Sequence, residues 1–502
     1  MNVAAHESDR PYAAHASADP AARILLFVLL LLAAFVCYWH LGTRTLADWD
    51  EAIYAQVAKE AARGGHWLTL HWAGQPWFEK PPLYVWTTAL LFRLFGVSEF
   101  WARAASAAAG VGVVAVTYAL GRAIYGRRVG LWGACVLLTS YQFLFFARFG
   151  TTDVLLTLFI YLALYGYVRL SARGPRWWYL IWAACALAFM VKGAAGLVAP
   201  ATVGLALCFE RDRRAPLRTR EFWCGCLLAL LIVAPWHVLM YARHGRAFVA
   251  EYVGYHTLAR MTTALEGHEG SYFYYVGRLV DGFFPWVLLV PAVIIAGLKR
   301  RGANPPGGRV LWLLCALVFV LYTLARTKIA WYIVPLYPAL ALLVAAFTAR
   351  VYDRYRARPF ARRAVVAACA LLAVVGALYS FLLLRAHERA ENPVAQLARQ
   401  AARDDASAHD ALLLLSDGGA FARPAALFYS DRPVRQTYLA DRPADQSAPR
   451  YFAPEELSAV TSIAPQPVIL RRADAARLAG AYDMQVRAEA GPLLYGTIRR
   501  KE

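Results

Sequence analysis

Ionisable side chains that could do chemistry gather in the polar segments that separate long apolar runs of this chain. The first such segment opens with Asp48-Trp49-Asp50-Glu51 and continues to Trp77-Phe78-Glu79-Lys80-Pro81. Later polar segments carry Asp153, Lys192, His256, Arg260, His268, Arg326, Lys328, Trp331 and Tyr332. Because ionisable groups are costly at membrane depth, those at the ends of apolar runs are functional candidates by default.

Two kinds of group in this set suit the transfer of a sugar from a lipid phosphate. A hydroxyl acceptor needs a carboxylate that orients it or takes its proton, and Asp50 and Asp153 are candidates for this role. The departing phosphate needs cations that stabilise its growing charge, and Lys80, Arg260 and Lys328 are candidates for that role. The set therefore predicts a polar pocket at a membrane interface.

A divalent metal ion is a further candidate component of this pocket. A carboxylate and an imidazole, Glu79 and His256, could hold an ion that shares the charge of the phosphate. A solvated loop histidine is the structural alternative for His256. The sequence leaves both interpretations open.

The other charged residues also have structural interpretations. Asp50 and Asp153 stand where helices are expected to begin, so each could be an N-cap. Glu51 could be the first-turn acid that complements a helix dipole. Ordinary anchoring at the membrane interface is the alternative for the lysines Lys80, Lys192 and Lys328.

The composition indicates which elements must position these residues. Of 502 residues, 60% are hydrophobic and 17% are charged, and the mean hydropathy is +0.41, which predicts an integral membrane protein. The formal charge of +20 comes from Arg and Lys residues that cluster between apolar runs. Topology signals have this pattern, so nucleic-acid binding is not expected. The eight cysteines lie in or beside apolar stretches and are interpreted as packing residues.

Apolar stretches near the length of a membrane span predict about eleven transmembrane helices. They begin close to residues 22, 101, 129, 152, 177, 194, 221, 283, 308, 329 and 361. Basic clusters occupy every second connection, and these connections are expected in the cytoplasm. The far side is expected to hold the connections at 41–100, 149–152, around 192, 241–282 and 325–330. If the apolar segment 81–95 were a full span, every later connection would change sides and the charge pattern would be broken. We therefore interpret it as a re-entrant or interfacial helix.

The chain divides into three expected parts. Residues 1–21 predict a disordered cytoplasmic N-terminus, and residues 22–385 predict the transmembrane domain. In residues 386–502 the apolar runs shorten to strand length, as in 411–415 and 468–470. Helix-like segments accompany them at 393–403 and 421–429. The expected fold class is an all-α polytopic membrane protein with a small C-terminal α/β domain on the outer side.

Several strings of residues resemble those of a known family. The first polar segment contains Asp50-Glu51-Ala-Ile-Tyr54-Ala, Gly65-His-Trp67-Leu, Phe78-Glu79-Lys80-Pro81-Pro82-Leu83 and Phe95-Gly96-Val-Ser-Glu99. Further matches follow in order at Asp153, Val191-Lys192-Gly193, Ala234-Pro235-Trp236, Gly267-His268 and Thr327-Lys328-Ile-Ala-Trp331-Tyr332. Over about residues 22–385 the chain resembles the bacterial GT-C glycosyltransferases. The nearest groups are the lipid A aminoarabinose transferases and the protein O-mannosyltransferase-like proteins.

The resemblance implies inverting transfer of a sugar from a polyprenyl-phosphate donor. The acceptor would be a hydroxyl or phosphate of a lipid, glycan or protein at the periplasmic face of a bacterial inner membrane. By the same resemblance Asp50 is the catalytic aspartate and Asp153 a second essential carboxylate, and Glu51 is a further catalytic candidate. No nucleotide cofactor is expected.

The resemblance also assigns the residues around the donor. Phosphate contacts would come from Lys80, Arg260 and Tyr332, with Lys192 and Lys328 as further candidates, and metal ligands from Glu79 and His256. Two departures argue against aminoarabinose and lipid A as the specific substrates. Ile53 stands where those transferases have Arg, and His256-Thr257 stands where they have a Glu-His pair. A polyprenyl-lipid phosphotransferase and a lipid or glycan flippase are the alternative functions.

Overall fold

The computed structural model describes residues 20–210, 215–264, 268–299, 305, 307–389, 391–404, 411–416, 424–438, 451–452, 461 and 465–501. The tail expected at 1–21 lies outside these residues except for its last two, and so does Gly267 of the Gly267-His268 string. The chain forms two compact units. One, called the helical unit here, comprises Ser106–Arg148, Thr152–Leu384 and the described part of Met1–Trp39. The other, called the mixed unit, comprises His40–Ala105, Phe149–Thr151 and Arg385–Glu502.

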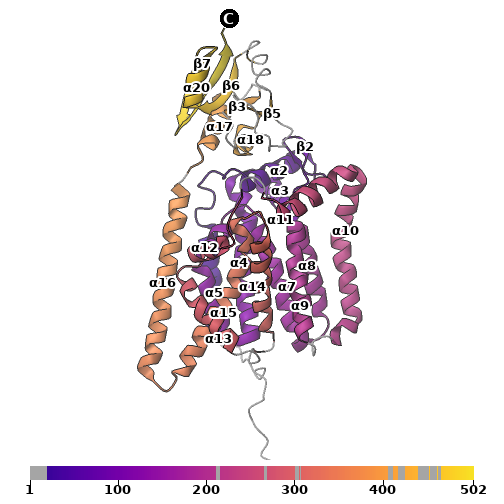
Figure 1. Cartoon of the computed structure of the whole chain (residues 1–502), viewed down its shortest axis with the longest axis vertical. Helices are drawn as coiled ribbons and strands as arrows, with labels where there is room; N and C mark the ends of the chain where they lie inside the picture. Colours follow the sequence, from indigo (N-terminus) through magenta and orange to yellow (C-terminus); the bar gives the residue numbers. More distant parts are fainter. Residues whose placement is uncertain are drawn as a thin grey trace, which may run out of the picture. The chain divides into compact units, whose positions relative to one another are not determined.

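The helical unit consists of apolar helices (Figure 1). Its first half contains α1 (Pro20–Tyr38), most of α4 (Glu99–Tyr125), α5 (Arg127–Leu138), α6 (Tyr141–Ala147), α7 (Asp153–Arg173), α8 (Trp177–Lys192), the 3-10 helix η1 (Gly193–Leu197) and α9 (Val198–Phe209). Its second half contains η3 (Ala215–Arg218), α10 (Arg220–Val249), the π-helix η4 (Ala250–Ala259), α11 (Arg260–Thr262), α12 (Tyr274–Gly282), η5 (Trp286–Leu289), α13 (Val290–Lys299), α14 (Arg309–Leu324), η6 (Ala330–Ile333), α15 (Leu336–Arg354) and most of α16 (Pro359–Arg389).

The length and apolar character of these helices confirm a polytopic membrane protein. Among the described residues, six helices are long and apolar enough to cross a membrane, or up to eight if each of two bent helix pairs is one span. The bent pairs are α5 with α6, at 74°, and α12 with the helix over Trp286–Lys299, at 117°. Three shorter apolar helices cover Arg23–Tyr38, Leu83–Phe95 and Arg309–Leu324. The described helices thus support several spans without fixing the number at eleven.

The chain reverses direction between α8 and α9. Gly193 has a φ of +53°, which favours glycine, and a Cβ at Gly196 would lie 2.4 Å from the Phe189 nitrogen. The end of α8 is tied to the start of α7 by the ion pair of Lys192 with Asp153. The residue after α9, Glu210, instead accepts a hydrogen bond from Tyr167 in the second half of α7. The helices α8 and α9 therefore run antiparallel. This agrees with the two separate spans that were expected to begin near 177 and 194.

The mixed unit combines the first polar segment with the C-terminal region. The polar segment forms α2 (Asp50–Gly64), a short hairpin of β1 (His71–Trp72) with β2 (Gln75–Pro76), and α3 (Leu83–Phe95). At 13 residues α3 is about 20 Å long, too short to cross a bilayer core of about 30 Å. Its length agrees with the interfacial or re-entrant helix expected at 81–95.

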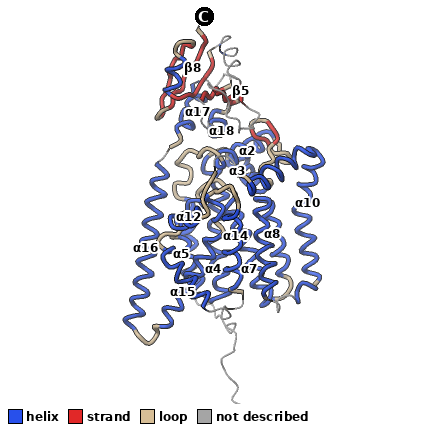
Figure 2. The backbone as a smooth tube through the Cα atoms, in the orientation of Figure 1, coloured by secondary structure: helices blue, strands red, loops and turns tan. Residues whose placement is uncertain are grey.

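The C-terminal region contains the expected small sheet, which is the largest block of strands in Figure 2. Its elements are α17 (Pro393–Asp404), β3 (Leu412–Ser416), α18 (Pro424–Ser430), β4 (Val434–Tyr438), β5 (Tyr451–Phe452), β6 (Gln466–Arg471), α20 (Arg472–Leu478), β7 (Tyr482–Ala490) and β8 (Leu493–Arg500). The strand order is β5-β4-β3-β6-β8-β7, with parallel pairs up to β6 and antiparallel pairs for β8. Of the helix expected at 421–429, residues 421–423 lie outside the described residues and the rest belongs to α18.

The buried leucines of β3 explain why this region folds as a layered domain. Successive side chains of a strand point to opposite faces of a sheet. Leu412 and Leu414 pack in the cluster that includes Val394 and Leu397 of α17, whereas Leu413 and Leu415 pack in the cluster with Leu478 of α20. A strand that is apolar on both faces is typical of a sheet covered on both sides.

Candidate active site

Asp50 is the first residue of α2. The residue before the helix is Trp49, with φ +69° and ψ −134°, and no side chain caps this helix end. Asp50 is therefore not the N-cap that the sequence left as an alternative; its carboxylate belongs to the first turn, where the helix dipole favours negative charge. A backbone of this kind in a non-glycine residue costs about 1–3 kcal/mol and persists only where the surroundings hold it.

Glu51 supplies much of that support. Its side chain is fully buried, and it accepts two hydrogen bonds from Arg103, of 2.7 and 3.0 Å, and one each from the backbone N–H groups of Ala47 at 2.8 Å and Gly150 at 2.9 Å. Burial alone would raise the pKa of Glu51, but the Arg103 guanidinium and the two N–H groups outweigh it and lower the pKa below its usual value. This geometry gives Glu51 a positioning role next to Asp50, while a catalytic role for it stays a prediction.

Arg103 is a component of the site that the sequence reasoning missed. Besides Glu51, its guanidinium donates to the carbonyl oxygens of Leu41 at 2.9 Å, Arg44 at 2.8 Å and Thr45 at 3.0 Å. All five of its N–H donors are therefore used. The available signal was its position in Trp101-Ala-Arg103-Ala-Ala, a single cation near the start of an otherwise apolar helix.

Glu79 and Lys80 form a second charged pair in the mixed unit. The Lys80 ammonium donates to the Glu79 carboxylate at 3.0 Å, and both side chains are 11% exposed. They directly precede Pro81 and Pro82, after which α3 begins. The pair presents one cation and one carboxylate together, so the two residues predicted as phosphate and metal contacts are brought side by side.

Asp153, Lys192 and Tyr332 meet in the helical unit. Asp153 begins α7 and Lys192 ends α8, and these helices lie side by side in Figures 1 and 2. The Lys192 ammonium donates to the Asp153 carboxylate at 2.6 Å and lies 5.2 Å from the centre of the Tyr332 ring. Three residues that were predicted from separate segments thus form one group, with a buried ion pair, at the end of the bundle where α7 begins.

Lys328 is close to this group in sequence but has a different role. Its ammonium donates to the carbonyl oxygens of Tyr322 at 3.0 Å, Thr323 at 2.5 Å and Ala325 at 2.6 Å. These carbonyls lie at the C-terminal end of α14, where a cation also complements the helix dipole. Because the three donors of the ammonium are used, binding of a phosphate by Lys328 requires it to exchange one of these bonds.

His256 and Arg260 lie on a helical segment where the sequence predicted the outer loop 241–282. After α10 the chain continues as the ten-residue π-helix η4, which contains His256, and Arg260 begins α11. Long π-helices are rare and π-type turns are frequent at functional sites. The Arg260 carbonyl accepts a hydrogen bond from the Thr327 N–H at 3.3 Å, which ties this segment to the string containing Lys328.

Glu79 and His256 were predicted as metal ligands. Within the part of the chain that the structure describes, no group of three His, Cys, Asp or Glu side chains is placed to hold a metal ion. Glu79 is paired with Lys80. The metal site at Glu79 and His256 stays a prediction, and no step of the chemistry is assigned to a metal.

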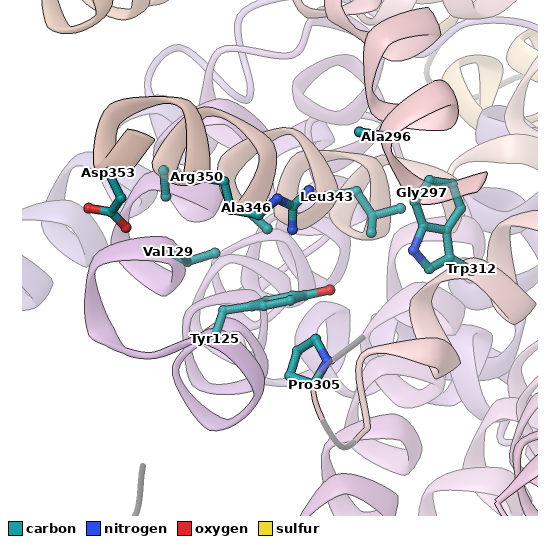
Figure 3. A pocket seen from close by; sticks show the side chains of 11 residues that line it. Tyr125, Val129, Ala296, Gly297, Pro305, Trp312, Leu343, Ala346, Arg350 and Asp353 are labelled. Carbon is teal, nitrogen blue, oxygen red and sulfur yellow. The ribbon is translucent and has the colours of Figure 1, made fainter. Parts of the chain in front are cut away.

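The cavity drawn in Figure 3 is not part of this candidate site. It has a volume of about 220 Å³ and is lined by Tyr125, Trp312, Arg350 and Asp353 with apolar neighbours. Tyr125 ends α4, and Arg350 and Asp353 lie in the last turn of α15, whereas Tyr332 precedes the start of α15. The cavity therefore lies at the opposite end of the helical unit from Asp153 and Lys192.

The fold and these charged groups define a polytopic membrane protein with ion-paired residues at one end of its helices. Residues 79–239 match the family model described as dolichyl-phosphate-mannose-protein mannosyltransferase. The crystal structure of ArnT from Cupriavidus metallidurans bound to undecaprenyl phosphate superposes with a TM-score of 0.77, at 22% identity, over 94% of this chain and 97% of that one. An oligosaccharyltransferase from Archaeoglobus fulgidus in the apo form has a TM-score of 0.58 at 11% identity and covers 89% of this chain and 69% of that one.

Sequence relatives agree with the structural ones. An undecaprenyl phosphate-alpha-4-amino-4-deoxy-L-arabinose arabinosyl transferase of Sodalis glossinidius is 30% identical over 364 residues, which is 69% of this chain and 64% of the relative. An uncharacterized protein of Aquifex aeolicus is 29% identical over 64% of this chain and 63% of the relative. The matches thus span a little under two thirds of these relatives. They confirm the predicted resemblance to the GT-C glycosyltransferases of the ArnT type.

Proposed function

We propose that this chain is an integral-membrane, inverting glycosyltransferase that takes its sugar from a polyprenyl-phosphate donor. The observation that carries the proposal is the group of Asp153, Lys192 and Tyr332, with its buried ion pair, at one end of an apolar helix bundle. A lipid phosphate meets protein at such an end, where charged groups in a low-dielectric setting interact strongly. The fold, which is shared with a protein solved with undecaprenyl phosphate, supports the same assignment.

The proposed reaction is a single displacement at the anomeric carbon of the sugar. The acceptor hydroxyl attacks opposite the phosphate while Asp50 takes its proton, and the bond from the sugar to the phosphate oxygen breaks. The polyprenyl phosphate that leaves gains negative charge, which Lys80 and Arg260 stabilise. Tyr332 and Lys192 are further phosphate contacts in this proposal, and Asp153 holds Lys192 in place.

The membrane arrangement in this proposal follows the charge pattern of the sequence. Basic clusters in alternate connections place those connections in the cytoplasm of a bacterial cell. About eleven spans then put Asp50, Asp153 and the C-terminal region on the periplasmic side of the inner membrane. The acceptor is a hydroxyl or phosphate of a lipid, glycan or protein there. The departures at Ile53 and at His256-Thr257 weigh against aminoarabinose and lipid A as the specific pair.

The test compares lipids and glycans from cells with the wild-type protein, without it, and with Asp50→Asn. Mass spectrometry is expected to show a sugar-sized mass that is present in the first and lost in the other two, with the variant still in the membrane. Asp353→Asn, which changes an exposed carboxylate at the opposite end of the bundle, is the matched control and should retain the modification. A phosphate-containing product would instead indicate a phosphotransferase, and lipid transport without a glycosylated product would indicate a flippase.

A further inference from the structure

The segment that leads into α2 is bound by C-terminal residues. The Leu46 N–H donates to the Tyr429 hydroxyl at 2.8 Å. Asn392 donates from its backbone N–H to the Thr45 hydroxyl at 3.1 Å, and from its side chain to the Leu46 carbonyl at 3.3 Å and the Asp48 carboxylate at 3.1 Å. Thr45, Leu46 and Asp48, shortly before Asp50, are thus hydrogen-bonded to residues more than 340 positions later in the chain.

Tyr429 is itself held in place. Its hydroxyl donates to the Glu99 carboxylate at 3.0 Å while it accepts from Leu46, and the Arg399 guanidinium lies 4.4 Å from the centre of its ring. Arg399 also forms an ion pair with Glu99. Burial raises the pKa of Tyr429 to about 12, so the hydroxyl keeps the proton that it donates. The contact to Leu46 is therefore a fixed one and not a chance approach of a surface tyrosine.

The C-terminal region also holds the body of α2. Lys59, in the third turn of this helix, is buried, and its ammonium donates to the Phe428 carbonyl at 2.5 Å and pairs with Asp431. The Ala425 N–H donates to the Asp48 carboxylate at 3.2 Å. All three partners come from α18 or the residue that follows it. The helix that begins with Asp50 is therefore fixed before its first residue and along its length.

The same segment is also held by the Glu51–Arg103 pair. Arg103 binds the Arg44 and Thr45 carbonyls, and Glu51 binds the Ala47 N–H. Between these two sets of contacts lies Trp49, whose positive φ needs support from its surroundings. Tyr429, Asn392 and Ala425 bind Leu46 and Asp48 in the same segment.

We infer that the C-terminal region is a positioning part of the transferase, in which Tyr429 and Asn392 fix the segment that places Asp50. The inference rests on the proposed function, because it assigns the position of Asp50 a consequence for transfer. It goes beyond the expectation of a small C-terminal α/β domain, to which the sequence assigns no role. Tyr429 and Asn392 act through the Asp50 segment and are positioning residues, not catalytic ones.

The experiment uses the full-length protein in detergent with Tyr429→Phe and Asn392→Ala. Amide hydrogen exchange of residues 45–53 is measured first, and it is expected to rise in both variants while exchange in the helical unit stays unchanged. Transfer is measured by adding the protein and the polyprenyl-phosphate sugar fraction to membranes of the deletion strain, which hold the unmodified acceptor. We expect kcat to fall by about ten- to a hundredfold, because small misplacements of a catalytic group have effects of this size, with KM for the donor unchanged. Tyr482→Phe, which removes a hydroxyl from β7 of the same region, is the matched control and should change neither quantity.

Each outcome decides a different statement. Unchanged exchange at 45–53 in both variants overturns the inference, because the C-terminal region then does not hold the segment. Raised exchange with an unchanged kcat also overturns it, because the position of the segment then has no effect on transfer. A wild-type protein that transfers no sugar from this donor fraction refutes the proposed function, while the exchange data still show whether Tyr429 and Asn392 hold the segment.

Discussion

The Asp153 carboxylate and the Lys192 ammonium lie 2.6 Å apart, and their side chains are only 3% and 8% exposed. Both side chains are largely removed from water, and their charges pair with each other. Removal of one member of a buried pair leaves the other charge without this partner, whereas removal of both charges is far less harmful. The pair is therefore a sensitive point for stability as well as for the proposed chemistry.

Lys192→Met is expected to lower the free energy of unfolding by about 3–5 kcal/mol, because it removes the cation that pairs with the buried Asp153 carboxylate. The double variant Lys192→Met with Asp153→Asn should recover much of this loss. Denaturant unfolding in detergent measures both values. Arg128→Met removes one partner of the exposed pair with Asp353 and should cost less than about 1 kcal/mol. A double variant as unstable as the sum of the two single ones would contradict the pairing.

Arg103→Lys tests the support beneath Asp50. A lysine ammonium has three donors and cannot replace the five hydrogen bonds that Arg103 makes to Glu51 and to three carbonyls. The free energy of unfolding should fall by about 3 kcal/mol, and the sugar modification in cells should fall with it. Arg93→Lys on the exposed side of α3 is the matched control. Wild-type stability and modification in Arg103→Lys would show that these bonds are dispensable.

The low pKa of Glu51 predicts a loss of stability in acid. A carboxylate whose pKa is lowered by folding stabilises the folded state above its unfolded pKa of about 4.3. That stabilisation is lost as the pH falls through the lower, folded pKa. The melting temperature of the wild type should therefore drop below about pH 4, and Glu51→Gln, which has no proton to gain, should drop less over the same range. Parallel curves for the wild type and Glu51→Gln, with Asp353→Asn as the exposed reference, would argue against this origin of the acid sensitivity.

Lys328→Met separates a helix cap from a phosphate contact. If Lys328 serves α14 as its hydrogen bonds indicate, the free energy of unfolding should fall by about 1–2 kcal/mol, and KM for the polyprenyl-phosphate donor should stay within about twofold of wild type. The two quantities are measured by denaturant unfolding and by transfer kinetics on the same preparation. A KM raised by about tenfold or more, which corresponds to about 1.4 kcal/mol, with unchanged stability would instead assign Lys328 to the phosphate.

The sequence was a good guide to what is encoded locally. The long apolar stretches predicted the helical class, and the shortened apolar runs after residue 386 predicted the C-terminal sheet. The break expected near 192 is present at Gly193, whose positive φ suits a residue without a Cβ. Helices were underestimated only where the polar content is high, as in η4, where the mixed composition of 250–259 resembled that of a loop.

Partnerships between distant residues could not be predicted from the sequence. Asp153 and Lys192 were both singled out, but their pairing depends on the antiparallel packing of α7 and α8. The use of Lys328 as a cap depends on the direction of carbonyl groups that only the helix end defines. Arg103 was overlooked because a single cation near a span end is also a common anchor. The division expected at residue 385 placed Tyr429 in a different domain from Leu46, although the two are hydrogen-bonded.

The hydrogen bond between Leu46 and Tyr429 can form only after both residues have been synthesised. The two residues are 383 positions apart in the chain. At a synthesis rate of about 5–20 residues per second, Tyr429 is made roughly 20–80 seconds after Leu46. During that interval the segment with Asp50 has no contacts from the C-terminal region and relies on those of the Glu51–Arg103 pair. The segment that places Asp50 therefore gains its C-terminal contacts only at the end of synthesis, after the membrane helices have been inserted.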